Sequence, residues 1–137
     1  MNLNKIILLI IFFSVSICNT FANESFTFDV AEIEIVEKGN KFLGRNGGTA
    51  TTGHGITIYA ENFEYNKSKN ILYANTNVKI EDKLNETTIF ADKITYLKND
   101  EIVFTQDKSK LIKKNITINS KSLKFNRNLN SFNAEGS

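Results

Sequence analysis

The sequence predicts an all-β protein in which hairpin repeats wrap around one shared interior. Three observations support this prediction. Beyond residue 22, apolar and polar residues alternate with a period of two, proline is absent from all 137 residues, and one irregularity in the alternation recurs about every 30 residues. A period of two is typical of strands with one buried face. A chain without proline leaves its backbone N–H groups free to enter β-ladders.

The first 22 residues are predicted to be a secretory signal peptide. Lys5 lies in a short polar start, residues 6–17 form an apolar run of twelve, and small residues stand at the usual positions before a cleavage site after Ala22. Such a run is too short to span a bilayer as a helix, although an uncleaved membrane anchor is the alternative. The predicted domains are therefore this leader, 1–22, and a β-domain, 23–137.

Charge and cysteine content argue against a nucleic-acid partner and against disulfide bonds. The chain has 17 basic and 15 acidic residues, and loss of the leader removes Lys5 and no acid, which leaves a net charge of +1. Interspersed charges of both signs are typical of a solvated surface, so no nucleic-acid partner is expected. The one cysteine, Cys18, would leave with the leader. We therefore expect no disulfide, and stability should come from a packed core.

The irregularity in the alternation predicts a bent strand. Apolar residues alternate up to a small residue, two polar residues follow, and the alternation resumes on the opposite parity. An extra residue exchanges the two faces of a strand, so the apolar side stays inward only if the strand bulges or bends there. The three stretches are 56–65, 87–96 and 116–125, with Ala60, Ala91 and Ser120 as the small residues.

Each bent strand is followed by a polar connection and a return strand. The connections 66–70, 97–100 and 126–130 are rich in Asn and Lys, which is typical of hairpin loops. With an earlier, degenerate unit, the chain comprises roughly four units of about 30 residues. The glycine-rich stretch 44–55 is predicted to be a flexible turn around a short Thr-rich strand. The last unit ends where the counterpart of Val78 would begin, which indicates an edge open to a partner or a fragment of a longer frame.

Three stretches carry a pattern that resembles a known family: "YAENFEYNKSKNILYANTNVKI", "FADKITYLKNDEIVFTQD" and "NSKSLKFNRNLNSFNAEGS". A small residue, an acid, an apolar-x-Tyr step and a polar turn lead to a return strand. The pattern resembles the OstA-like family of lipopolysaccharide transport, which includes the bridge protein LptA and the N-terminal periplasmic domain of the assembly protein LptD. The resemblance covers about residues 26–137. It implies a β-jellyroll of two antiparallel sheets in an open V.

The resemblance also implies a function. The module would bind lipopolysaccharide, shield its lipid A acyl chains and help to deliver it to the outer membrane, in the periplasm or at the periplasmic face of that membrane. Expected partners are lipopolysaccharide and other transport proteins, joined by strand addition at a sheet edge, with self-association as a further alternative. Whether the chain is a stand-alone bridge or part of a longer assembly protein stays open. A structural scaffold or adhesin fragment without a lipid ligand is the competing hypothesis, and no cofactor is expected.

Apolar side chains are predicted to line the interior and to contact acyl chains as a set. Each buried methylene contributes roughly 0.8 kcal/mol, so partial insertion of several chains would give useful affinity. For any single residue, filling the core is the simpler interpretation. The predicted set is Ile58, Phe63, Tyr65, Tyr73, Ile89, Ile94, Tyr96, Phe104, Ile118, Leu123 and Phe125. Basic residues that would meet lipid phosphates near the opening are Lys79, Lys83, Lys93 and Lys98.

Catalytic and metal chemistry are not predicted. His54, the one histidine, lies in the glycine-rich stretch, where an exposed loop residue is the simplest interpretation. Acids such as Glu61, Glu64 and Asp92 recur at equivalent positions, which indicates surface or turn roles. The sequence has no nucleophile motif and no phosphate-binding loop that leads into a helix. A binding protein is therefore favoured over an enzyme.

Overall fold

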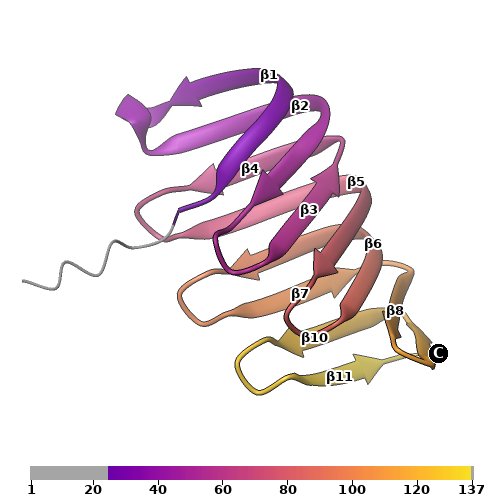
Figure 1. Cartoon of the computed structure of the whole chain (residues 1–137). Coiled ribbons are helices and arrows are strands. Elements are labelled where there is room, and N and C mark those ends of the chain that lie inside the picture. Colours follow the sequence, from indigo (N-terminus) through magenta and orange to yellow (C-terminus); the bar gives the residue numbers. More distant parts are fainter. Residues whose placement is uncertain (1–24, 137) are drawn as a thin grey trace, which may run out of the picture.

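Eleven strands form one antiparallel sheet that bends back on itself (Figure 1). The structure, a computed structural model, describes residues 25–136. A short 3-10 turn, η1 (Glu37–Gly39), joins the first two strands. The strands are β1 (Thr27–Val36), β2 (Lys41–Thr51), β3 (Ile56–Ala60), β4 (Asn62–Asn66), β5 (Ile71–Asp82), β6 (Thr87–Leu97), β7 (Ile102–Gln106), β8 (Ser109–Lys113), β9 (Ile116–Ser120), β10 (Ser122–Asn126) and β11 (Ser131–Glu135).

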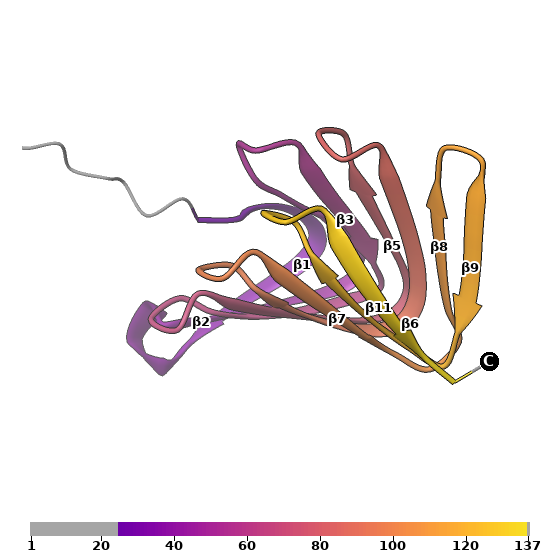
Figure 2. The same ribbon diagram turned by 90° about the horizontal axis from the view of Figure 1, so that it is seen from below.

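The bend divides the sheet into two arms that face each other. Strands β1, β2, β5 and β6 run through the bend and belong to both arms, whereas β4, β7, β10 and β11 lie in the first arm and β3, β8 and β9 in the second. Figure 2 shows the arms diverging from the bend, with hairpin loops at their free ends. We call the opening between these ends the mouth. It is bounded by loops 67–70, 98–101 and 127–130 of the first arm and by loops 52–55 and 83–86 of the second.

The positions at which the sequence predicts bent strands, which we call corners, lie at the bend of the sheet. Ala60, Ala91 and Ser120 are all buried on its inner side. Apolar residues before and after each change in the parity of the alternation are buried as well, for example Ile58 and Phe63. The change of parity therefore keeps one face of the chain inward through the bend, as the repeated pattern predicts.

The return strands turn the same corner in a different way. In β5, Thr76 and Asn77 have φ angles of 68° and 54°, and the register against β6 shifts at this point. Between β7 and β8, Asp107 and Lys108 have φ angles of 58° and 49°. Two consecutive left-handed residues thus produce each of these bends. Residues other than glycine adopt this conformation at a cost, so it is a local constraint on the sequence.

The glycine-rich stretch is a strand for most of its length. The predicted Thr-rich strand is the end of β2, but the predicted turn around it is too long. β2 continues to Thr51 and only residues 52–55 form the loop. The glycines serve the corner instead. At Gly48, with φ 153°, an added Cβ would lie 2.2 Å from the carbonyl oxygen of Asp29. Glycine is needed here because β1 and β2 approach closely where both strands bend.

The arms enclose a hydrophobic core. Both contribute side chains without solvent exposure, among them Tyr96 and Phe125 from the first arm and Ile58 and Leu111 from the second. The predicted all-β jellyroll is confirmed, and the two expected sheets are the two arms of one sheet, because four strands run through both. The predicted leader, residues 1–22, lies outside the described residues.

Candidate functional site

The candidate site is the interior between the two arms. Of the eleven residues predicted to line it, most are buried in the core, and Ile118 packs against that core while remaining partly exposed. The buried ones are Ile58, Phe63, Tyr65, Ile89, Ile94, Tyr96, Leu123 and Phe125. The structure therefore brings these nine side chains together. Their contact with a lipid stays a proposal.

Tyr73 and Phe104 do not lie in the interior, and their predicted placement is wrong. Tyr73 is 42% exposed on the outer face. Phe104 is half-buried on the outer face too, where the ammonium of Lys124 lies 5.7 Å from its ring centroid. The reason is strand register. Directly paired residues share a face, and the hairpins pair Tyr65 with Leu72 and Tyr96 with Val103.

Aromatic rings fill the part of the interior nearest the start of β1. Phe26, just before that strand, packs edge-on against Tyr65 and Tyr96, with centroid distances of 5.3 and 5.5 Å. Phe28 packs against Phe63 and stacks on Phe42. Neither Phe26 nor Phe28 was among the residues predicted to line the interior. The rings of Phe26 and Phe28 thus fill space between the arms.

The hairpin loops of the first arm repeat one arrangement at the mouth. The hydroxyl of Tyr65 donates to Asn70 Oδ1 at 2.7 Å, and the hydroxyl of Tyr96 donates to Glu101 at the equivalent place. Asn70, Glu101 and Asn130 all have left-handed backbones, with φ angles of 52°, 54° and 48°. Asparagine tolerates this conformation better than glutamate. The presence of glutamate at the second of these positions, Glu101, indicates that its carboxylate makes an additional contact.

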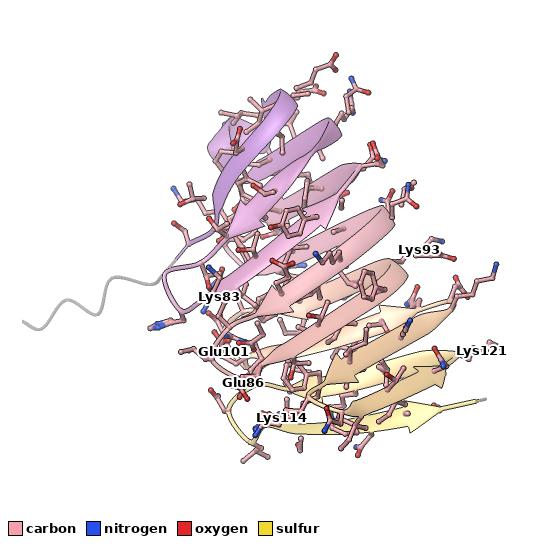
Figure 3. The ribbon with its side chains drawn as sticks, turned by 45° about the vertical axis from the view of Figure 1, so that its right-hand side comes forward. Lys83, Glu86, Lys93, Glu101, Lys114 and Lys121 are labelled. Atoms are coloured by element: carbon pink, nitrogen blue, oxygen red, sulfur yellow. The ribbon has the colours of Figure 1, made fainter. Side chains whose placement is uncertain are left out.

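Glu101 belongs to a buried cluster of charged groups at the mouth. Arg127 of the first arm donates from Nε to Asp82 Oδ2 of the second arm at 2.6 Å, and from Nη2 to the carbonyl oxygen of His54 at 3.0 Å. Its Nη1 donates to the hydroxyl of Tyr96 at 3.0 Å and to Glu101. We call Asp82, Tyr96, Lys98, Glu101 and Arg127 the mouth cluster. In Figure 3 the labelled Glu101, Lys83 and Glu86 lie on this side of the molecule.

The charges of the mouth cluster stabilise one another. Burial by itself raises the pKa of Asp82, but hydrogen bonds from Arg127 and Asn85 outweigh it, so its pKa lies below the ordinary value. Glu101 behaves alike: burial opposes ionisation, and the contacts with Lys98, Tyr96 and Arg127 hold its pKa below the ordinary range. Both carboxylates are therefore charged at neutral pH.

Comparison with known proteins decides the family. Residues 45–133, well over half of the chain, match the family model described as lipopolysaccharide-assembly, LptC-related. The chain belongs to the LptC-related lipopolysaccharide-assembly family. The resemblance expected from the repeats is thereby confirmed, and with it a function in lipopolysaccharide transport.

A solved structure shares the fold of this LptC-related protein. It is the crystal structure of LptH, the LptA-homologous periplasmic component of the lipopolysaccharide transport device of Pseudomonas aeruginosa. The likeness covers 83% of this chain and 84% of that chain, with a TM-score of 0.75 and 15% sequence identity. At this identity the likeness concerns the fold alone. No curated protein is similar in sequence at a significant level.

The four predicted basic residues of the LptC-related protein do not gather in one place. Lys79 lies over the ring of Tyr59 and pairs with Glu81 on the outer face of the second arm. Figure 3 shows Lys83 and Lys93 on opposite sides of the molecule, the first at the mouth and the second at the bend. Lys98 is buried in its ion pair with Glu101. A shared phosphate site made by these four lysines is therefore not formed.

Sequence reasoning missed the mouth cluster because Arg127 lies in a loop expected to be solvated. One signal was available in the repeat itself. A basic residue stands two positions after Tyr65, Tyr96 and Phe125, namely Lys67, Lys98 and Arg127. These basic residues are 31 and 29 positions apart, the same spacings as those of the corner residues. Within residues 25–136, neither a group of potential metal ligands nor a helix able to cross a membrane is present.

Proposed function

We propose that this LptC-related protein shields the acyl chains of lipopolysaccharide between its two arms during transport through the periplasm. One observation carries the proposal. The arms turn apolar faces toward each other, hydrogen-bonded strands join them at the bend, and side chains such as Arg127 and Asp82 connect them across the mouth. An acyl chain can enter by this side without breaking a β-ladder.

Entry requires the interior to rearrange, since Tyr96 and Phe125 have no solvent exposure in this structure. The energetics permit it. Five methylene groups of an acyl chain contribute about 4 kcal/mol on burial, which can offset the separation of a few apolar contacts. Interfaces that open and close around a ligand take this energy from the difference in affinity between the two states. The proposal therefore requires that the open state bind lipid more tightly than the closed state.

The apolar inner face continues to both ends of the sheet. At one end Ile33 and Ile35 of β1 are 53% and 58% exposed, and they pair with Gly44 and Phe42, whose face is inward. At the other end Ile116 of β9 is 54% exposed on the face of Ile118. Edges of this kind suit strand addition by a partner. We propose other lipopolysaccharide-transport proteins as these partners, with self-association as the second candidate.

The periplasm is the proposed location. Support comes from the leader predicted over residues 1–22 and from the fold shared with a periplasmic component. We propose binding and transfer without a catalytic step. The competing hypothesis, a scaffold without lipid, would leave the family membership unexplained.

Photo-crosslinking tests the acyl-shielding proposal with neighbouring residues as matched controls. Benzoylphenylalanine would replace Leu72, on the inner face, or Tyr73, the next residue, on the outer face. We expect an adduct with lipopolysaccharide at position 72 and none at 73. Because Leu72 is fully buried, a second pair uses the less buried Ile118 and the exposed Asn119 of β9. Equal labelling of both faces, or native masses without lipid A adducts, would contradict the proposal.

A further inference from the structure

The mouth cluster connects the free ends of the two arms. Arg127 lies in the β10–β11 loop of the first arm, and it reaches Asp82 at the end of β5 and the carbonyl of His54 in the β2–β3 loop, both in the second arm. A second contact crosses nearby, from Lys113 of β8 to Asn130. All these groups stand at the side through which an acyl chain would enter.

The cluster does more than close a hairpin. In the neighbouring hairpin, neutral groups are enough to close the loop, since the hydroxyl of Tyr65 donates to Asn70, whose amide donates to Asn99. At the equivalent positions Tyr96 and Glu101 meet Arg127, which also binds the opposite arm. Glu101 has the left-handed backbone of this hairpin position, which costs glutamate more free energy than asparagine, and its carboxylate makes this contact. The charged version of the loop therefore adds a contact between the arms.

An ionic contact is suited to a closure that must open. Side-chain exposure is 5% for Arg127 and 1% for Asp82, so both ions have lost their water in the closed state. The attraction within a buried pair is largely offset by this loss of hydration. When the arms separate, water solvates both ions again. The pair thus fixes the geometry of the closed mouth, while its release costs less than that of an equally buried apolar contact.

Phe26 occupies the space beneath the cluster. Its ring packs edge-on against Tyr96, the residue whose hydroxyl accepts from Arg127. The side chain is buried although the chain enters the fold here. An aromatic side chain from the start of β1 therefore fills interior volume next to the entry side, where part of an acyl chain would fit.

We propose that Arg127 and Asp82 form a latch that holds the mouth closed, and that Phe26 fills the interior beneath it until an acyl chain of the ligand displaces its ring. The inference rests on the proposed acyl-shielding function and names the residues that control access to that site. Lipid binding and opening of the latch are then linked: a variant with a weakened latch populates the open state more often and takes up lipid faster.

The latch is tested without lipid by measuring the distance between the arms. Spin labels would be placed on Lys83→Cys and Asp100→Cys, exposed loop positions of opposite arms, in full-length chain carrying Cys18→Ser. Pulsed electron paramagnetic resonance should give a narrow distribution for the parent and a broader, longer one for Arg127→Met and for Asp82→Asn. Labels on Lys83→Cys and Lys114→Cys, both in the second arm, should show no change. An unchanged distribution between the arms in a folded Arg127→Met variant would overturn the latch.

Lipid uptake provides the second readout. We expect the rate of photo-crosslinking between purified lipopolysaccharide and benzoylphenylalanine at position 118 to rise about tenfold in Arg127→Met and in Phe26→Ala. Lys113→Cys and Asn130→Cys joined by a short thiol crosslinker should suppress it. Arg45→Met, which removes an exposed arginine paired with Glu34, serves as the control. Opening without any lipid adduct would refute the proposed function and leave the latch standing, whereas adducts at parental rates in every variant would refute the latch.

Discussion

Arg127 and Asp82 are 45 positions apart in the sequence and lie in opposite arms, yet the guanidinium Nε donates to the carboxylate at 2.6 Å. A second hydrogen bond, from Nη2 to Oδ1, is 3.3 Å long. Such a bidentate pair is the strongest polar geometry open to these groups. Because both side chains are almost completely buried, each depends on the other for its charge to be tolerated.

Arg127→Met should destabilise the fold by about 3–5 kcal/mol, since it leaves Asp82 buried without its partner. The double variant Arg127→Met with Asp82→Leu should recover most of this loss, because no charge then remains unpaired. Urea unfolding of both single variants and the double variant gives the coupling free energy. Arg45→Met removes one member of an exposed pair and should cost less than about 1 kcal/mol. Additive losses in the double variant would show that the pair is not coupled.

Acid should weaken the fold through the same groups. The pKa values of Asp82 and Glu101 are lowered on folding from ordinary values of 3.8 and 4.5. The unfolded state therefore takes up protons first as the pH falls, so stability is complete above about pH 5 and declines below it. Urea midpoints measured between pH 6 and pH 3 should fall for the parent and fall less steeply for Asp82→Asn with Glu101→Gln. Parallel curves would assign the acid sensitivity to other carboxylates.

The fold could be predicted because its decisive features are local. The parity slip at Ala60, Ala91 and Ser120 can be read within ten residues, and a change of face without a change of burial has one geometric solution, a bend. Hairpin loops rich in Asn and Lys mark the free ends in the same way. These patterns were enough to predict an all-β fold of bent hairpins around one interior, and the resemblance to the OstA-like family implied that this fold is a jellyroll.

The remaining features depend on relations that alternation does not encode. Loop length and register decide on which face Tyr73 and Phe104 lie. In each hairpin the apolar residue before the ring, Leu72 or Val103, pairs with an inward tyrosine and takes the inner position. Arg127 meets Asp82 only after the arms fold toward each other. The predicted leader lies outside the described residues 25–136, and the predicted lipid contacts stay predictions.

Thr76→Asn should stabilise the protein. Thr76 has a φ of 68°, and a β-branched residue is strongly disfavoured in this left-handed region, whereas asparagine adopts it more readily. Relief of the strain is expected to contribute about 1 kcal/mol, measured as a higher urea midpoint with an unchanged slope. Thr57→Asn, in the extended strand β3, should have the opposite sign because asparagine is depleted in strands. A loss of stability at position 76 would show that the threonine side chain has a role that outweighs the strain.

Gly48→Ala should be severely destabilising. The new methyl group would lie 2.2 Å from the backbone oxygen of Asp29 and 2.6 Å from the Cα of Val30, so β1 would have to move away from β2. Gly39→Ala is the control, because its φ of 90° is left-handed too but nothing lies within 4 Å of the added carbon. We expect a loss of about 1–2 kcal/mol at position 39 from backbone strain alone, and a larger loss at position 48. Thermal or urea unfolding measures both, and equal losses would exclude a steric role for the β1–β2 approach.

Alanine at two adjacent positions of β5 would test the register that determines the inner face. Leu72 is fully buried and pairs with Tyr65, whereas Tyr73 is on the outer face opposite Glu64. Leu72→Ala should cost about 2–5 kcal/mol through lost burial and the cavity left behind. Tyr73→Ala removes a larger side chain yet should cost less than about 1 kcal/mol, because its ring already contacts water. The two losses in stability show which face of β5 points inward. If Tyr73→Ala were the more damaging change, the strand would present its other face to the interior, and Leu72 could not line an acyl-chain site.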